Sequence, residues 1–295
     1  MKTALVTGAT GFIGGHVVRA LVAAGWRVHA VKRSTSDTSG LKEAEPAVAF
    51  HDIDRVSPDD IFSAGPFDAV CLLATSYGRG NEPPSETLGA NLLAPLRLLE
   101  RAVAAQVPAV LHADTCFTPD YQYLRPYTLS KKQFAQWGRI LCDQTATRFV
   151  NLVLQHPYGP GDRPAKFLPG IIRECLESTG NISLTAGEQR KDFVYVGDVA
   201  AAFLAVLAHL DQLPTGSTDL ECGTGRALSI RELVETVHRL TGSRAKLDFG
   251  ALPYRANEIM LSEADTIGLR ALGWEPRVSL EDGLRATLRE DFGRG

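Results

Sequence analysis

The chain has 295 residues and an ordinary apolar content of 44%, enough for one large α/β domain or for a large and a small one. Its formal net charge of −3 gives no reason to expect nucleic acid or a membrane surface as a partner. No apolar stretch approaches the ~20 residues that span a bilayer. The five cysteines are scattered without metal-ligand spacing, so we expect reduced thiols, a cytoplasmic location and no bound metal.

The opening segment carries the strongest motif. An expected strand over 3–7 leads into Gly8, Gly11 and Gly14, and an expected helix over 12–24 follows. Gly8 lets the chain turn where a Cβ would clash, Gly11 lets the backbone approach a pyrophosphate, and Gly14 lets the helix pack closely on its strand. This placement predicts a dinucleotide whose phosphates face the free N–H groups of the helix; the alternative is a glycine-rich turn without a ligand.

Strand-like runs alternate with helical patterns through the first half of the chain. This alternation predicts a doubly wound parallel Rossmann sheet, covered by helices on both faces. The further strands are expected over 27–31, 47–51, 68–74, 109–113 and 149–154, and the helices over 86–105 and 127–145.

The second half is less regular and predicts a smaller, lid-like C-terminal α/β domain with one or two excursions back to the main sheet, which we expect to be the substrate-binding domain. A loop is expected over 157–169, an extended piece over 192–196, and helices over 167–178, 199–209 and 230–240. Ser229 is the expected N-cap of the last of these, Gly242 its stop, and Ser279 opens a final helix. We assign 1–156 with about 192–222 to the dinucleotide-binding domain, and about 157–191 with 223–295 to the second.

Tyr127 and Lys131 form the spacing Y-x-x-x-K. Residues four apart share one face of a helix, so the Lys131 ammonium is expected near the Tyr127 phenol, where it favours the phenolate and makes Tyr127 an acid or base. Thr115 follows the expected strand over 109–113, at the edge where open α/β sheets bind ligands. Its hydroxyl is expected to bind a substrate carbonyl. The alternatives are a surface Tyr–Lys pair and a threonine that serves only the turn.

Along essentially its whole length the chain resembles the extended short-chain dehydrogenase/reductase superfamily. The motifs that carry this resemblance are the 7–14 turn, the Thr115, Tyr127 and Lys131 constellation, Tyr158-Gly-Pro160, Asp192-Phe-Val-Tyr-Val-x-Asp198, Gly273-Trp-x-Pro276 and Ser279-Leu-Glu-x-Gly283. Further segments are most similar to the nucleotide-diphosphate-sugar 4-ketoreductase group: Val150-Asn-Leu, His156-x-Tyr-Gly-Pro-Gly-Asp162, Lys166-Phe167 and Gly187-Glu-Gln-x-x-Asp-Phe193. The resemblance implies reduction of the C4 ketone of a CDP-, dTDP- or GDP-linked deoxysugar, in which Tyr127 donates the proton.

The same resemblance implies further site residues. The cofactor is expected against the turn (Gly8, Thr10, Gly11, Phe12, Ile13 and Gly14), the adenine pair Asp52 and Ile53, the segment Leu73, Ala74 and Thr75, and both Tyr127 and Lys131. The substrate is expected against Thr115, Tyr127, His156, Lys166 and Phe167, and its diphosphate against Arg255 and against Arg190 or Lys191. A homodimer through the helices over 86–105 and 127–145 is implied as well.

The cofactor type follows from the end of the second expected strand. NAD enzymes of this fold usually place an acid there to bind the ribose 2′-hydroxyl. Here the chain reads Lys32-Arg33-Ser34, and two cations and a hydroxyl suit a 2′-phosphate. We therefore expect NADPH rather than NADH, unless Lys32 and Arg33 are merely solvated.

Two features separate the possible reactions. The 4,6-dehydratases of the superfamily follow the catalytic threonine with Asp-Glu, whereas Cys116 and Phe117 follow Thr115 here, which argues against dehydration. A nucleotide-sugar 4-epimerase that retains NAD is the main alternative, and a non-catalytic NADP sensor is the second. Cys116 with His156 or His112 offers an added epimerisation step; the simpler interpretation is a buried cysteine.

Overall fold

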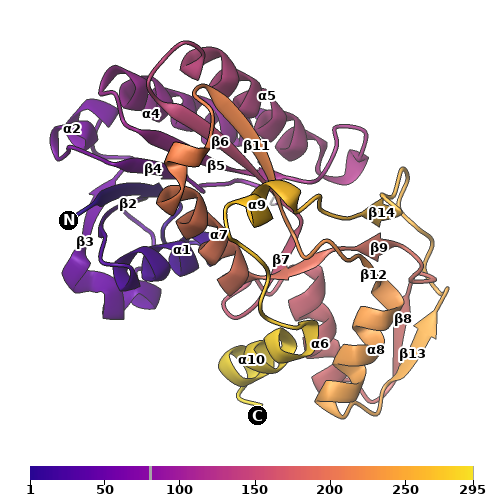
Figure 1. The fold of residues 1–295 in the computed structure, drawn as a ribbon. Helices are drawn as coiled ribbons and strands as arrows, with labels where there is room; N and C mark the ends of the chain where they lie inside the picture. Colours follow the sequence, from indigo (N-terminus) through magenta and orange to yellow (C-terminus); the bar gives the residue numbers. More distant parts are fainter. Residues whose placement is uncertain (80–81, 295) are drawn as a thin grey trace.

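The computed structural model describes residues 1–79 and 82–294, and its main element is a seven-stranded parallel sheet in the order β11-β6-β5-β4-β1-β2-β3 (Figure 1). The strands are β1 (Thr3–Thr7), β2 (Arg27–Lys32), β3 (Val48–Asp52), β4 (Ala69–Leu72), β5 (Ala109–Thr115), β6 (Arg148–Leu154) and β11 (Ser217–Cys222). The order 3-2-1-4-5-6 is that of a Rossmann sheet, so the predicted fold class is confirmed.

Helices cover both faces of this sheet (Figure 1). Alternate residues of each strand point to opposite faces, so Val6 packs with α1 (Phe12–Ala23) and α7 (Val196–Ala208), whereas Leu5 packs with α2 (Pro58–Ser63), α4 (Ala94–Ala104) and α5 (Arg125–Cys142). A 3₁₀ segment, η1 (Ser39–Ala47), lies between β2 and β3. The two apolar layers fix the carboxyl ends of the strands at one edge, where the site lies.

The helices over 86–105 and 127–145 differ in detail from the prediction. The first consists of α3 (Pro84–Leu88), a π-helical turn η2 (Gly89–Leu93) and α4. Pro95 in the first turn of α4 has no N–H to donate, which favours such a shift in the hydrogen-bond ladder. The second begins at Arg125, after a 3₁₀ turn η3 (Gln122–Leu124), and ends at Cys142 because the next residue, Asp143, has an extended ψ of 134°; Gln144 then adopts a positive φ of 56°.

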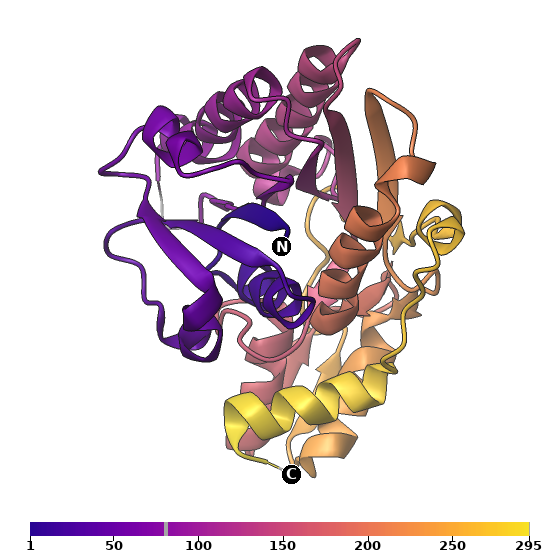
Figure 2. The same ribbon diagram turned by 60° about the vertical axis from the view of Figure 1, so that its left-hand side comes forward.

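The second half forms a smaller layer around its own apolar core. Its helices are α6 (Phe167–Glu177), α8 (Ile230–Thr241) and α10 (Leu280–Phe292), and its main strand pair is β8 (Asn181–Leu184) with β13 (Lys246–Phe249). Figure 2 shows α10 on the outer side of this layer. Ser229 and Ser279 cap α8 and α10, and Gly242 ends α8 with a φ of 62°, as predicted.

Short strands connect the two layers. They are β7 (His156–Tyr158) with β10 (Phe193–Tyr195), and β9 (Arg190–Lys191) between β12 (Leu228–Ser229) and β14 (Leu261–Ser262). The expectation of a loop from residue 157 was wrong for β7, which pairs with β10 and so leaves the loop to begin after Tyr158. A 3₁₀ turn η4 (Leu210–Gln212) follows α7.

One stretch of the second half belongs to the first core. Leu269, Leu272 and Trp274, in and after α9 (Ile267–Ala271), pack with β11 and α7, although we expected 223–295 in the second domain. The Trp274 indole donates to Asp198 O at 3.0 Å, and this contact holds the stretch against α7. Within residues 1–79 and 82–294, no helix is long and apolar enough to cross a membrane.

Candidate active site

The turn between β1 and α1 has the geometry that its glycines predict. Gly8 has a φ of +65°, and a Cβ there would lie 2.7 Å from the backbone nitrogen of Ala74. A Cβ at Gly14 would overlap the carbonyl oxygen of Gly8. Gly11 is the N-cap of α1, whose first turn contains no acidic residue. Its N–H groups and positive dipole end therefore form a cradle that fits the phosphates of a dinucleotide.

Thr7 fastens this turn to the segment after β4. Its hydroxyl oxygen accepts hydrogen bonds from the backbone nitrogens of Leu73 at 3.0 Å and Ala74 at 3.1 Å. Thr75 donates from its hydroxyl to Leu73 O at 3.5 Å. Two of the expected cofactor segments thus lie side by side. Sequence reasoning did not single out Thr7, whose only signal was its place as the last residue of β1.

The ends of β2 and β3 bring Lys32 and Asp52 into contact. Lys32 Nζ lies 2.6 Å from Asp52 Oδ1, with side chains 12% and 27% exposed, and Ile53 N donates to Lys32 O at 2.8 Å. Ser34 is held by Asp54 through its hydroxyl at 2.6 Å. Arg33 is exposed beside this pair. Of the two cations expected at this edge, Lys32 is therefore engaged by a carboxylate.

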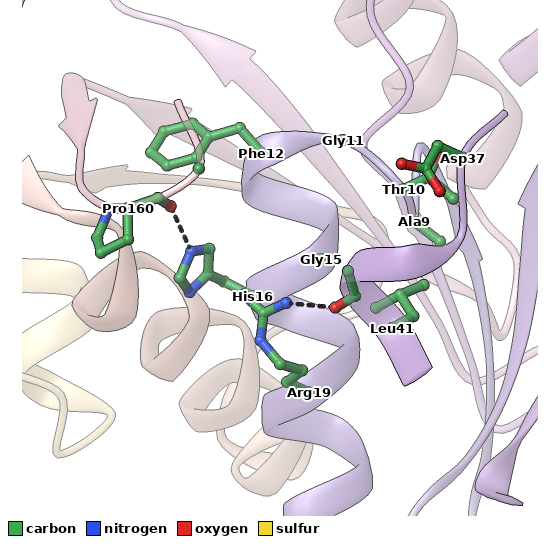
Figure 3. Close-up of a pocket in the computed structure, with 12 residues that line it drawn as sticks. Ala9, Thr10, Gly11, Phe12, Gly15, His16, Arg19, Asp37, Leu41 and Pro160 are labelled. Atoms are coloured by element: carbon green, nitrogen blue, oxygen red, sulfur yellow. Dashed lines mark hydrogen bonds between the residues drawn. The ribbon is translucent and has the colours of Figure 1, made fainter. Parts of the chain in front are cut away.

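A small cavity of about 160 Å³ lies beside the start of α1 (Figure 3). His16 contacts Pro160 O at 3.0 Å and Arg19 donates to Gly40 O at 3.0 Å, which closes its sides. The cavity is lined by Ala9, Thr10, Gly11, Phe12, Gly15, His16, Arg19, Asp37, Gly40, Leu41, Pro160 and Gly161. The cavity is continuous with the phosphate cradle at Gly11. Ile13, which we expected at the cofactor, does not line the cavity and packs against the core under α1.

Thr115 and Tyr127 meet at the carboxyl end of β5. Thr115 is the last residue of this strand, which runs two residues further than expected, and Tyr127 lies in the first turn of α5. Burial raises the pKa of Tyr127 well above 10, while a hydrogen bond from Thr115 opposes this. We expected the nearby Lys131 cation to favour the phenolate; in this structure burial has the larger effect, so the net shift of the Tyr127 pKa is upward. The phenol keeps its proton.

Lys131 lies one turn further along α5, on the face of Tyr127. It is 1% exposed. Burial lowers the pKa of its ammonium to about 8, and the Asp114 carboxylate partly opposes that shift. Lys131 therefore remains mainly protonated at neutral pH and supplies a buried positive charge one helical turn from Tyr127.

Asn91 in the π-helical turn is a site residue that sequence reasoning missed. Its side-chain oxygen accepts from Ser76 N at 2.7 Å, and its amide donates to Ser76 O at 2.8 Å and to Ser130 Oγ at 3.0 Å. Ser130 in turn donates to Tyr127 O at 2.7 Å. Asn91 thus joins the segment after β4 to the helix turn that carries the phenol. A polar residue within a helical apolar pattern was its signal.

Lys166 links the second domain to the cofactor cradle. Its ammonium lies 5.0 Å from the ring centre of Phe12 and 5.6 Å from that of Tyr77, and 2.7 Å from Asp162 Oδ1. The Tyr77 ring lies 4.8 Å from the ring of Tyr127. Lys166, which we expected at the substrate, therefore lies next to Tyr77, whose ring contacts that of Tyr127.

The structure separates Arg190 from Lys191, which the sequence left as alternatives. They are successive residues of β9, so they point to opposite sides. Arg190 is exposed and donates to Ala227 O at 2.8 Å. Lys191 is 6% exposed and lies 3.4 Å from Glu258 Oε1. Its charge acts on His156, so Lys191 is the member of the pair on the His156 side.

Arg255 is held at the far side of the site by aromatic rings. Its guanidinium donates to the Tyr121 hydroxyl at 3.2 Å and stacks 3.7 Å from the ring centre of Tyr123. Arg255 thereby contacts the loop between Thr115 and Tyr127. Phe167, at the start of α6, is 48% exposed.

His156 and Cys116 are both partly buried and uncharged. The His156 ring lies 5.7 Å from the ring of Phe117 and 5.6 Å from that of Phe193, and its Nδ1 has no hydrogen-bond partner among the described residues. Burial and Lys191 lower its pKa to about 3. Burial raises the pKa of Cys116 to about 11, and its thiol donates to Gln155 O at 3.8 Å. Neither group is charged at neutral pH.

Comparison with known proteins gives a consistent result. A model of the NAD dependent epimerase/dehydratase family matches residues 4–223. CDP-abequose synthase from Salmonella muenchen is 32% identical over 291 residues, which cover 97% of both chains. UDP-glucose 4-epimerase from Thermotoga maritima, solved with UDP-glucose, has a TM-score of 0.83 at 25% identity and 98% coverage of both chains. MoeE5, solved with UDP-glucose and NAD, has a TM-score of 0.82 at 27% identity and the same coverage.

Proposed function

Because the chain belongs to the NAD dependent epimerase/dehydratase family, we propose that it is an NADPH-dependent reductase of a nucleotide-diphosphate-linked 4-keto-deoxyhexose. The observation that carries the proposal is the Tyr127 phenol, which burial keeps protonated while Thr115 hydrogen-bonds it. A protonated phenol is the form that a ketone reduction requires. Similarity to CDP-abequose synthase over nearly the whole chain supports the same reaction class.

Each residue of this group has a defined task. Tyr127 donates its proton to the C4 oxygen, and the Thr115 hydroxyl donates a second hydrogen bond to the same atom. Lys131 stabilises the resulting phenolate by its charge and binds the ribose hydroxyls of the cofactor. Bound NADPH would supply the hydride that reduces the carbon. Cys116 and Phe117 replace the Asp-Glu pair of the 4,6-dehydratases, so water loss has no acid and base here.

The cofactor preference depends on the edge formed by β2. Arg33 is exposed there, and a guanidinium binds a 2′-phosphate through charge-assisted hydrogen bonds. Lys32 is engaged by Asp52, so we assign the 2′-phosphate to Arg33 and the adenine edge to Asp52 and Ile53. NAD enzymes usually carry an acid in this place.

The substrate diphosphate is assigned to three cations from the second half of the chain: Lys166, Lys191 and Arg255. Each already contacts an acceptor: Asp162, Glu258 and the Tyr121 hydroxyl, respectively. We expect a CDP-, dTDP- or GDP-linked sugar whose C4 lies at Thr115, beside His156 and with Phe167 at the rim. Much of the binding energy then comes from the nucleotide diphosphate, remote from the reacting carbon.

A 4-epimerase is the second candidate, because the solved relative from Thermotoga maritima bears that name and MoeE5 was solved with NAD. Both activities use the same Tyr–Lys pair. They differ in turnover, since an epimerase regenerates its cofactor in each cycle and consumes none.

The deciding experiment follows the loss of reduced-nicotinamide absorbance, with NADPH and NADH assayed separately. The substrates are CDP-, dTDP- and GDP-linked 4-keto-deoxyhexoses, and product sugars are identified by chromatography. Consumption of NADPH with one of them is the expected result. Interconversion of sugar isomers without consumption of either cofactor would assign the epimerase instead.

We also propose a cytoplasmic homodimer. Leu129, Trp137 and Ile140 of α5 are 42%, 44% and 64% exposed, and Leu93 at the end of the π-helical turn is 52% exposed. Such a row of apolar side chains on neighbouring helices suits a symmetric interface. The five free cysteines suit a reducing compartment.

A further inference from the structure

We propose that Asp114 and Lys132 are a positioning pair for the Thr115, Tyr127 and Lys131 site, because together they fasten the end of β5 to helix α5. The inference rests on the proposed function for its kinetic test and on geometry for its structural basis. Neither residue belongs to the motif that identifies the site. Both lie directly beside motif residues, Asp114 before Thr115 and Lys132 after Lys131.

Asp114 is a carboxylate buried at the end of a strand. The residue is 4% exposed, and its Oδ1 accepts a hydrogen bond from Thr115 N at 2.7 Å. Its Oδ2 accepts from Lys132 Nζ at 2.8 Å and from Asn151 Nδ2 at 3.2 Å. A buried carboxylate persists only where it is paired and hydrogen-bonded, and this one meets both conditions. Its three partners come from β5, β6 and α5.

Lys132 contacts strand β5 at two points. Besides Asp114, its ammonium donates to the carbonyl oxygen of Thr115 at 2.5 Å. The main-chain N–H and C=O of Thr115 are thereby held by this pair, one by each member. The Thr115 hydroxyl is then placed against Tyr127, which α5 carries five residues before Lys132. The pair thereby fixes the position of β5 relative to α5, and so the position of Thr115 relative to Tyr127.

The same pair sets the charge around Lys131. Asp114 favours the protonated ammonium of Lys131, whereas Lys132 disfavours it. His112, a titratable side chain of β5 whose pKa Lys131 helps to lower, is fully buried and uncharged at neutral pH because burial lowers its pKa well below 6.5. The protonated Tyr127 adds no charge. The pKa of Lys131 is therefore influenced by two opposite charges, that of Asp114 on β5 and that of Lys132 on α5.

Two substitutions test the pair because their effects have opposite signs. Lys131 has a pKa of about 8, so we expect kcat to fall as the pH rises through that range. Asp114→Asn removes the charge that favours the ammonium and should move this alkaline limb to lower pH. Lys132→Gln removes the opposing charge and should move it to higher pH. Each shift should be on the order of one pH unit.

Asp219→Asn is the matched control. Asp219 accepts from the same Asn151 amide at 2.9 Å but contacts neither Thr115 nor α5 residues 127–132. Its removal should leave the pH profile in place. A general loss of folding would lower kcat at all pH values in both test variants without shifting the limb in opposite directions.

A second readout needs no substrate. In protein labelled with ¹³C-lysine, the ¹³Cε shift of Lys131, assigned with Lys131→Met, reports its titration directly. Opposite displacements in the two variants support the pair. Unchanged titration, or displacement in the same direction, overturns it. If the NMR displacements appear but no sugar is reduced, the pair stands and the proposed reaction fails.

Discussion

The two sides of the site hold their charged groups in different ways. On the catalytic side, formed by β5 and α5, Tyr127 is 6% exposed and Lys131 is 1% exposed, and burial dominates the pKa of each. On the binding side, the cations Lys166, Lys191 and Arg255 are drawn from loops and a two-residue strand, and each contacts an acceptor: Asp162, Glu258 and the Tyr121 hydroxyl, respectively. Lys191 is as buried as Tyr127, at 6% exposed, so the two sides differ in this pairing rather than in burial alone. We call these the catalytic wall and the binding wall.

This difference indicates how the site divides its work. Groups that move a proton need a fixed pKa, and a fixed pKa requires rigid burial in a packed sheet. In our proposal, the groups that bind the diphosphate exchange an internal acceptor, either a carboxylate or the Tyr121 hydroxyl, for the phosphate oxygens of the substrate. The catalytic wall should therefore govern kcat, and the binding wall KM.

The largest effect is expected on the catalytic wall. Tyr127→Phe removes the proton donor while keeping the ring that contacts Tyr77. We expect kcat to fall by about 10³-fold, with little change in KM for the sugar nucleotide. Steady-state kinetics with the substrate found in the panel test this. Activity equal to that of the wild type would show that Tyr127 is not the proton donor.

A smaller effect is expected on the binding wall. Lys191→Gln should raise KM for the sugar nucleotide roughly 10- to 100-fold with kcat almost unchanged, because a charge-assisted contact to the diphosphate is lost. Arg190→Gln is the matched control, since this neighbour donates to Ala227 O on the other side of β9. A larger KM increase in the Arg190 variant than in the Lys191 variant would reverse our assignment.

The residues at the end of β2 that we expect to contact the cofactor, Lys32 and Arg33, lie outside both walls and allow a separate test. Arg33→Ser should raise KM for NADPH roughly 10-fold and leave KM for NADH unchanged, because only NADPH offers a 2′-phosphate to the guanidinium. Lys32→Gln should have a smaller effect on NADPH, since Lys32 is already bound to Asp52. Equal losses with both cofactors would show that Arg33 has no part in the preference.

The catalytic wall could be predicted from the sequence because local patterns encode it. The glycine spacing, the apolar runs that form the individual strands and Y-x-x-x-K each depend on neighbours within a few residues, and the structure contains all of them. The missed residues Thr7 and Asn91 act through backbone groups far along the chain, at positions 73–76 and 130. No pattern among neighbouring residues predicts such a long-range contact.

The binding wall could be predicted only in part. The sequence named Arg190 and Lys191 as alternatives, and the choice between them depends on the register of β9 with β12 and β14. These pairings join segments that are 37 to 71 residues apart in the chain, so neither periodicity nor turn chemistry fixes them. The direction of the Tyr127 pKa shift was likewise missed, because burial depends on tertiary packing.

The smallest effect is expected in stability, and it again distinguishes the walls. His112 of β5 is fully buried between the rings of Phe134 and Phe149, and burial lowers its pKa well below 6.5. Because its folded pKa lies below its unfolded value, the unfolded chain binds the proton first as the pH falls below 6.5. At pH 5.5 this favours unfolding by about 1.4 kcal/mol.

His112→Leu should remove that part of the acid sensitivity and leave the Lys–carboxylate pairs of the binding wall untouched. Melting curves between pH 7.5 and 5.5 measure it: the wild type should lose a few degrees more than the variant over this range, on the order of 3 °C. Equal losses in both proteins would mean that His112 accepts its proton in the folded state, and the catalytic wall would then be looser than its burial indicates.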